Sequence, residues 1–508
     1  MKKYIIILCS FVILLGCNDD FLNQENPNTL TPDQFWKDEA DATSAIVGAY
    51  SPLSTVFCHG RLFHGMTQAL SDAIRVNSDF SRQASLYDLD AGNARIKEGW
   101  GEYWKVVFRT NLVIENVPNI EMDEDLKNNI IGEAYFLRAY SYFILVNYFK
   151  NIPLITVAGT NISEAQQPQV DESLVWQQIK DDLTTAIPLL PNTWDSDNKG
   201  RVMKSSAAAL LGRTHLYLEE WTEASTELKR IIDGEFGTID LAPTYAENFR
   251  ESGQNNIESL FEIQFDATGA WTAGWGADVP STARFHSLGQ DYARGGHGQI
   301  NEWVLDLFLS ELTNGGDIDP RAYETIIWDY PGAEHFGQPF TSKYSREIQS
   351  ANDDGATYVR SAKYVNPNGG GDVPAFNTFA VNKKIIRFAD VLLMYAEAEN
   401  EANNGPTSNA YTAVNRVRAR VDMPDFAPGM DQETFRQKLR DERVLELTLE
   451  DIRQLDLLRW GMLPDRITDN EDFRTGNLSY VPGREYFPIP QLEMDTNPQI
   501  NEQNPGYE

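Results

Sequence analysis

The chain has 508 residues, of which 42% are hydrophobic and 11% aromatic, so it carries enough apolar surface for a sizeable core. Its formal net charge of -32 repels phosphate backbones and anionic membrane surfaces, which excludes nucleic acid as a partner. Two of the three cysteines lie in the amino-terminal leader. Cys58 alone therefore remains as a possible thiol of the mature chain, which cannot build a disulfide framework or a cysteine metal site.

Residues 1–16 are typical of a lipoprotein signal peptide. A basic start is followed by an apolar run over 4–15, which is too short to span a bilayer, and Gly16 then precedes Cys17 as in a lipobox. The alternative is an ordinary secretory leader with an incidental cysteine. We expect Cys17 to be lipidated and the polar segment 17–31 to be a tether, because several acyl chains on one residue hold a protein stably at a membrane.

An N-terminal helical part is predicted over residues 32–240. A proline in the first turn and an apolar stripe predict its first helix over 32–50. Between 58 and 99 the periodicity weakens and polar side chains predominate, which predicts an irregular surface loop. Trp100 and Trp104 then recur at the spacing of a buried helical stripe, which favours core packing for both rings.

Four further helices are predicted over 126–149, 173–190, 204–219 and 222–233. Within them Leu211–Gly212, Ala224 and Leu228 lie at offsets like those of a tetratricopeptide repeat, although Ala208 and His215 stand where that repeat has aromatic residues. Small residues at these offsets let paired helices approach closely. Stacked pairs would then bury a shared core and form a helical-repeat scaffold.

Residues 241–382 break the helical pattern and form a predicted loop-rich insertion. The segment is rich in aromatic residues and glycine, with brief strand-like pieces at 260–265 and 324–328 and one short helix over 299–309. A long region of this kind in a helical protein is usually a functional loop layer.

Residues 383–508 return to helices, which we expect to form one compact body with 32–240. Helices over 387–399, 410–421, 435–448 and 449–460 are predicted from their apolar stripes. Asp456 and Arg459 lie one turn apart in the last of these helices, so we expect them to pair.

Four strings resemble signatures of the SusD/RagB family, the nutrient-binding outer-membrane lipoproteins of the Bacteroidetes. They are RFADVLLMYAEAEN, AVNRVRARVDMP, ERVLELTLEDIRQLDLLRWG and PIPQLEMDTNPQINEQNPGY. The resemblance implies a mainly α, tetratricopeptide-like scaffold with an irregular, aromatic and glycine-rich loop layer. It also implies capture of an oligosaccharide and its delivery to a TonB-dependent SusC-like transporter. Acidic residues directly after Cys17 resemble the family's export signal, so the lipid-anchored protein is expected on the outer face of the outer membrane.

An extended, uncharged glycan needs flat rings for its C–H faces and polar groups for its hydroxyls. The loop layer has that inventory, and the resemblance adds two residues of the early loop. The candidate ligand-binding residues are Asp72, Arg75, Trp271, Trp275, Tyr292, Trp328 and Tyr330. Each ring could instead pack in the core or between loops, and Asp72 and Arg75 could instead be solvated loop charges.

No catalytic, metal or cofactor motif stands out. The six histidines show no HExxH spacing, the run Gly369–Gly371 lacks a following Lys-Ser or Lys-Thr, and Asp317 and Asp319 suit a capped turn better than a calcium loop. We therefore expect a binding protein without chemistry, cofactor or metal. A RagB-like peptide binder, a secreted glycosidase and a helical adhesin or scaffold are the rival functions.

Overall fold

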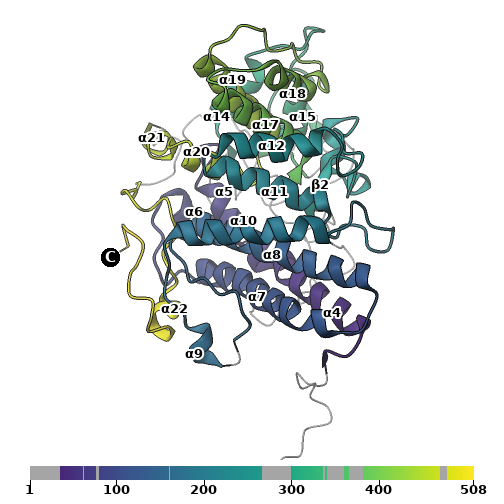
Figure 1. Cartoon of the computed structure of the whole chain (residues 1–508). Coiled ribbons are helices and arrows are strands. Elements are labelled where there is room, and N and C mark those ends of the chain that lie inside the picture. Colours follow the sequence, from purple (N-terminus) through teal and green to yellow (C-terminus); the bar gives the residue numbers. More distant parts are fainter. Residues whose placement is uncertain are drawn as a thin grey trace, which may run out of the picture.

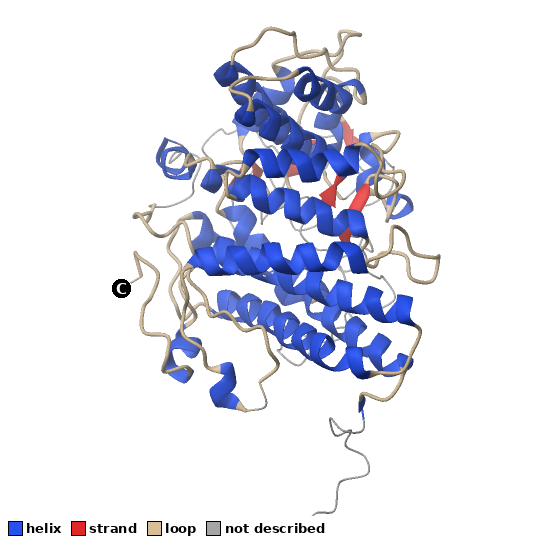
Figure 2. Ribbon diagram, in the orientation of Figure 1, coloured by secondary structure: helices blue, strands red, loops and turns tan. Residues whose placement is uncertain are grey.

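The computed structural model describes residues 35–60, 62–75, 79–159, 161–265, 299–335, 338–339, 360–364, 381–469 and 478–507. The predicted signal peptide and tether, including Cys17, lie outside the described residues. Helices stacked side by side make up most of the described structure, and a few short strands lie beside them (Figure 1 and Figure 2). The predicted mainly α fold class is confirmed.

The N-terminal helices pack around one long, enclosed helix. They are α4 (Glu39–Tyr50), α5 (Leu62–Ala69), α6 (Asp79–Ser85), α7 (Ala94–Asn116), α8 (Glu124–Phe149), α9 (Ile162–Ala165), α10 (Glu172–Leu189), α11 (Lys204–Tyr217) and α12 (Trp221–Ile232). Helix α8 lies between α7 and α10 (Figure 1), and its second half is buried on every side. Asp123 caps its start by accepting a hydrogen bond from the backbone N–H of Leu126.

Helices α11 and α12 form a close antiparallel pair that depends on Gly212. A Cβ atom at this position would lie 2.7 Å from Leu228 Cδ2, and Ala224 is fully buried in the same interface. These are the small residues that the repeat-like spacing singled out, so the predicted close approach of the two helices is confirmed. The next layer follows directly, because α12 packs against α17 (Phe388–Ala402).

The remaining helices extend this stack. They are α14 (Glu302–Leu309), α15 (Pro320–Thr325), α18 (Ser408–Ala419), α19 (Gln432–Leu447), α20 (Arg453–Arg459), α21 (Leu463–Asp469) and α22 (Gln491–Thr496). Helix α17 packs against both α18 and α19. The predicted helix over 449–460 starts only at Arg453, because Leu449 and Asp451 have positive φ angles of 71° and 63°, which no helix accommodates.

Short strands connect segments that are far apart in the sequence. They are β1 (Ile74–Arg75), β2 (Ser259–Ile263), β3 (Gln299–Ile300), β4 (Ile326–Ile327), β5 (Glu334–His335), β6 (Gln338–Pro339), β7 (Arg360–Ser361) and β8 (Lys383–Arg387). One sheet has the order β1-β3-β7-β4, and antiparallel pairs join β2 to β8 and β5 to β6. The strands predicted at 260–265 and 324–328 are thus present in shortened form.

The expectation of an irregular surface loop over 58–99 is wrong for its described residues. Helices α5 and α6, strand β1 and the start of α7 occupy this segment, and Phe63, Met66 and Leu70 are buried in the core. Of the polar side chains that obscured the periodicity, Asp72 is buried and paired with arginines, whereas Arg82 is exposed. Trp100 is buried as predicted, and Trp104 packs partly buried beside it.

Charged side chains of the C-terminal helices form a buried network instead of a solvated face. Glu446 is fully buried and accepts hydrogen bonds from Arg321, Arg387 and Arg420. The predicted pair between Asp456 and Arg459 is confirmed, with 2.9 Å between Arg459 Nη2 and Asp456 Oδ1. The network holds together segments that the sequence places more than a hundred residues apart, because a buried guanidinium group needs carboxylate partners.

Candidate functional site

The four-stranded sheet brings the early predicted site residues next to the loop-rich insertion. Ile74 in β1 pairs with Ile300 in β3, and β7 then bridges β3 and β4. The segment that carries Asp72 and Arg75 therefore shares one sheet with the segment that leads to Trp328 and Tyr330. Sequence analysis placed these residues in one site only through the family resemblance, because the pairing partners are more than two hundred residues apart.

Asp72 is a buried anchor of this region. Its carboxylate accepts two hydrogen bonds of 2.8 Å from Arg453 and one of 2.7 Å from Arg466 Nε, and its backbone carbonyl accepts one from Trp303 Nε1 at 2.9 Å. Burial alone raises the pKa of a carboxyl group, but the two guanidinium groups outweigh it and hold the pKa of Asp72 below its usual value. The alternative of a solvated loop charge is thus wrong for Asp72.

The predicted rings fall into three groups. Trp328 is 3% exposed and lies 5.1 Å from Tyr323 and 4.8 Å from Tyr330 between ring centroids, so it packs in the interior as the alternative had it. Tyr330 is half-buried. The rings of Trp271, Trp275 and Tyr292 lie outside the described residues, and Arg75 is described only through its backbone in β1.

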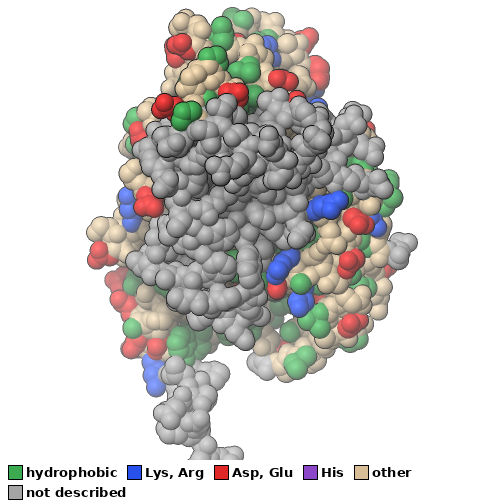
Figure 3. Space-filling view, turned by 180° about the vertical axis from the view of Figure 1, so that it is seen from behind, with side chains coloured by type: hydrophobic (Ala, Val, Ile, Leu, Met, Phe, Trp, Pro, Cys, Tyr) green, Lys and Arg blue, Asp and Glu red, His purple; other side chains and the backbone are tan. Residues whose placement is uncertain are grey.

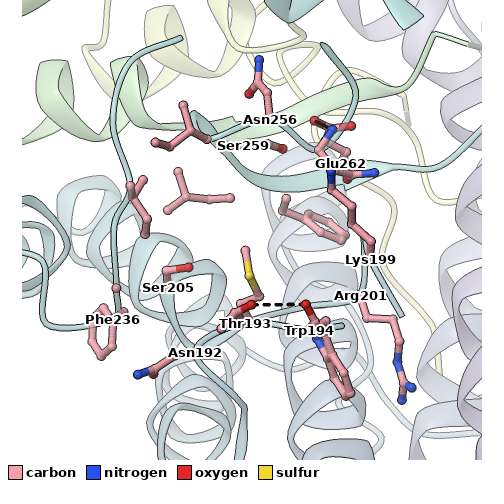
Figure 4. A pocket seen from close by; sticks show the side chains of 18 of the residues that line it. Asn192, Thr193, Trp194, Lys199, Arg201, Ser205, Phe236, Asn256, Ser259 and Glu262 are labelled. Carbon is pink, nitrogen blue, oxygen red and sulfur yellow. Dashed lines mark hydrogen bonds between the residues drawn. The ribbon is translucent and has the colours of Figure 1, made fainter. Parts of the chain in front are cut away.

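A cavity of about 530 Å³ lies at one end of the α10, α11 and α12 stack (Figure 4). It is lined by residues of four segments, which are 192–201, 203–205, 236–239 and 255–262. The first segment connects α10 to α11, the third follows α12, and the last leads into β2. The volume falls in the range of small-molecule sites, roughly 300 to 1,000 Å³.

The lining of this cavity combines rings with neutral polar groups. Figure 4 shows Asn192, Thr193 and Trp194 on one side, Phe236 on another and Asn256 opposite them. The hydroxyl of Ser205, which is fully buried, has no hydrogen-bond partner in the part of the chain that the structure describes. A ligand hydroxyl that reached it would satisfy a buried polar group, which is otherwise costly.

The main charged groups of the lining are paired within the protein. Arg201 donates to Glu133 through Nε at 3.0 Å and through Nη2 at 2.5 Å, and its guanidinium lies 4.2 Å from the ring centroid of Trp194. Glu262 is buried and pairs with Lys384. The four charged residues of the lining, which are Asp195, Lys199, Arg201 and Glu262, sum to zero net charge, and the last two already have their counter-ions, so the cavity suits an uncharged polar ligand better than an ionic one.

Sequence reasoning missed this cavity. Its residues come from connections between helices, where no periodicity marks them, and only the presence of Trp194 in a polar turn after Pro191 could have signalled it. On the face seen from behind Figure 1, acidic and basic side chains are interspersed over the described surface (Figure 3). Within the described residues, no helix combines the length and the apolar character needed to cross a membrane.

Comparison with known proteins identifies the family. The profile of the SusD family matches residues 257–507, and a second profile, described as starch-binding associating with outer membrane, matches residues 20–217. The chain belongs to the SusD family. The two matches together span both the N-terminal helices and the C-terminal helices that surround the loop-rich insertion.

Relatives of this SusD-family chain are similar along its whole length. A SusD-like protein from Formosa agariphila is 27% identical, and the match covers 100% of both chains. The crystal structure of a SusD superfamily protein from Bacteroides vulgatus is 27% identical with a TM-score of 0.78, covering 93% of this chain and 100% of that one. A laminarin-binding SusD-like protein is 26% identical with a TM-score of 0.74 over the same shares of the two chains.

Proposed function

We propose that this protein is a non-enzymatic lipoprotein of the outer membrane that captures an oligosaccharide and passes it to a TonB-dependent, SusC-like transporter. Three findings support the proposal: the family membership, the starch-binding description of the N-terminal profile, and the laminarin-binding relative that is covered over its full length. A β-glucan oligosaccharide is therefore the first ligand to test. Lipidation at Cys17 would keep the protein at the membrane.

The observation that carries the proposal is the cavity lined by Trp194, Ser205 and Asn256. Sugars present alternating apolar faces and hydroxyl groups, and the cavity offers rings beside amides and an unsatisfied hydroxyl. Arg201 and Glu262 have counter-ions within the protein, and the exposed Asp195 and Lys199 are opposite in sign, so the lining as a whole favours an uncharged ligand. Trp271, Trp275 and Tyr292 remain predicted stacking residues of the loop layer.

Isothermal titration calorimetry with laminari-oligosaccharides, starch oligosaccharides and a peptide mixture tests this function. We expect heat of binding with a neutral glycan, and an affinity that agrees at low and high salt because an uncharged ligand offers nothing for salt to screen. Heat only with peptides, with a steep salt dependence, would favour the RagB-like peptide binder. Reducing sugar released by the purified protein would instead show a glycosidase.

Two sets of variants then locate the ligand. Ser205→Ala should weaken binding by up to roughly tenfold if its hydroxyl contacts the sugar, because one hydrogen bond contributes about 1 kcal/mol. Replacement of Trp271, Trp275 or Tyr292 with alanine should weaken it roughly ten- to hundredfold where the ring stacks on the glycan, by analogy with base stacking. Thr226→Ala, which removes an exposed hydroxyl on α12, is the matched control. If every variant binds like the parent, neither surface is the site.

A further inference from the structure

Three side chains with metal-binding atoms meet in the interior. Cys58 and His59 belong to the tight turn η2 (Val56–Gly60), and His64 lies in α5. Their ligand atoms all lie within 4.8 Å of one another, and none of the three residues is more than 1% exposed. Sequence analysis discounted a cysteine metal site because only one cysteine remained and the histidines showed no known spacing.

The three side chains converge on the phenolic oxygen of Tyr103. This oxygen lies 2.8 Å from His64 Nε2 and 3.2 Å from His59 Nε2, and it also hydrogen bonds to the thiol of Cys58. The two imidazole rings are stacked with centroids 3.7 Å apart and planes inclined by 14°, so they present the same edge to Tyr103. One sulfur, two nitrogens and one oxygen thus surround a single small volume.

A carboxylate orients His64 for coordination. Asp451 Oδ2 lies 2.9 Å from His64 Nδ1, and the same carboxylate pairs with Lys383. The carboxylate thus lies on the Nδ1 side of the ring, while Nε2 faces the Tyr103 oxygen at 2.8 Å. Histidines that bind metals are typically oriented by a carboxylate in this way.

We propose that Cys58, His59 and His64 bind one zinc ion, with the Tyr103 oxygen as the fourth ligand. Sulfur and imidazole donors in a closed tetrahedral set favour Zn²⁺ over the hard cations, which prefer oxygen. Zinc bonds of about 2.0 to 2.3 Å place donors roughly 3.3 to 3.8 Å apart. The donors of Cys58, His59 and His64, which lie within 4.8 Å of one another, need to move together by up to about 1 Å, and the Tyr103 oxygen, 2.8 Å from His64 Nε2, needs to move away from it by about 0.5 Å. Binding replaces the proton of the Cys58 thiol, which passes to solvent, and a Zn–S bond forms.

The ion would connect four separate segments. Cys58 and His59 precede α5, Tyr103 belongs to α7, His59 also accepts or donates a hydrogen bond of 2.9 Å with Tyr140 of α8, and Asp451 follows α19. A structural metal binds the folded chain and not the unfolded one, so it stabilises the fold. The site is independent of glycan capture, and the protein can fail one test and pass the other.

Metal analysis of the full mature chain tests the proposal. Protein produced in zinc-supplemented medium should contain one zinc per chain by mass spectrometry. Because the donors are buried, protein refolded from denaturant with Co²⁺ should show the near-ultraviolet absorption of a thiolate–Co²⁺ bond, whereas protein only soaked in Co²⁺ should not. Cys58→Ser should abolish that absorption, and His59→Gln and His64→Gln should lower the metal content. His215→Gln, in the half-buried pair with Glu220, is the control and should keep both signals.

A wild-type protein without stoichiometric zinc and without the thiolate–Co²⁺ absorption would overturn the proposal, and would leave the cluster as a hydrogen-bonded network only. That result needs no variant, so it decides the question even where a substitution prevents folding. Absorption that persists in Cys58→Ser would also overturn it, because the sulfur ligand would then be another residue.

Discussion

Replacing Glu446 with glutamine should destabilise the protein more than removing any one exposed charge of α19. Glu446 Oε1 accepts from Arg387 Nη1 at 2.5 Å, Oε2 accepts from Arg321 Nη1 at 3.0 Å, and Arg420 also donates to Oε1. All four side chains are buried. Glutamine keeps one acceptor but turns two N–H donors toward groups that have only donors.

The expected loss in the free energy of unfolding is about 3 to 5 kcal/mol, the usual cost of leaving buried charges without their partner. The remaining carboxylates limit the loss, since Arg387 keeps Glu258 and Glu450, and Arg321 keeps Asp319. The estimate therefore lies nearer the lower end of this range.

Denaturant unfolding followed by circular dichroism provides the measurement, with Glu433→Gln on the same helix as the control. Glu433 pairs with Arg436 at the surface, and its side chain is 70% exposed, so its loss should cost about 1 kcal/mol or less. Equal midpoints for the two variants would refute the reasoning, because they would show that burial gives the network no special contribution to stability.

Three further predictions concern the buried charge network, the apolar core and the lipid anchor. Although burial raises the pKa of Glu446, Arg420, Arg387 and Arg321 hold it well below its usual value. The contribution of Glu446 to the free energy of unfolding should therefore be complete above about pH 4.5 and should fade as the pH drops toward the folded-state pKa. The melting temperatures of wild type and Glu446→Gln should converge in acid, and a difference that stays constant with pH would contradict this prediction. Leu392→Asp should unfold the protein, because an unpaired charge at a fully buried position costs several kcal/mol. Trp275→Ala, in contrast, should melt at the temperature of the parent protein. A Trp275 variant that melts as early as Leu392→Asp would show that this ring belongs to the core. Cys17→Ala should release the protein from membranes in cells that lack the partner transporter, and membrane pelleting that persists in high salt would contradict lipid anchoring.

Most of the helices could be predicted from local sequence patterns. Helices such as α8, α10 and α12 begin and end within a few residues of their predicted bounds, because apolar residues recur along them at helical spacing. The close pair of α11 and α12 was visible in the spacing of small residues for the same reason.

The rest depends on partners that no local window contains. Asp72 looked like a loop charge because Arg453 and Arg466 stand nearly four hundred residues away, and only the folded chain brings them together. The ion pairs of Glu446 with Arg321 and Arg387 also join segments that are distant in the sequence. The cavity near Trp194 and the cluster around Cys58 also gather residues from separate segments, so neither has a signature in any one stretch of sequence.

The antiparallel pairing of β2 with β8 has a consequence for how this chain can vary in length. The segment between Ile263 and Lys383 carries α14 and α15 of the stack, and its two end residues are opposite each other in the register. The two ends of this segment are thus fixed side by side, whatever the length of the chain between them. Residues can be gained or lost inside it at a modest entropic cost that grows only slowly with length, without shifting the register of any helix outside it. Loops of this segment can therefore vary in length while the stack of helices remains the same.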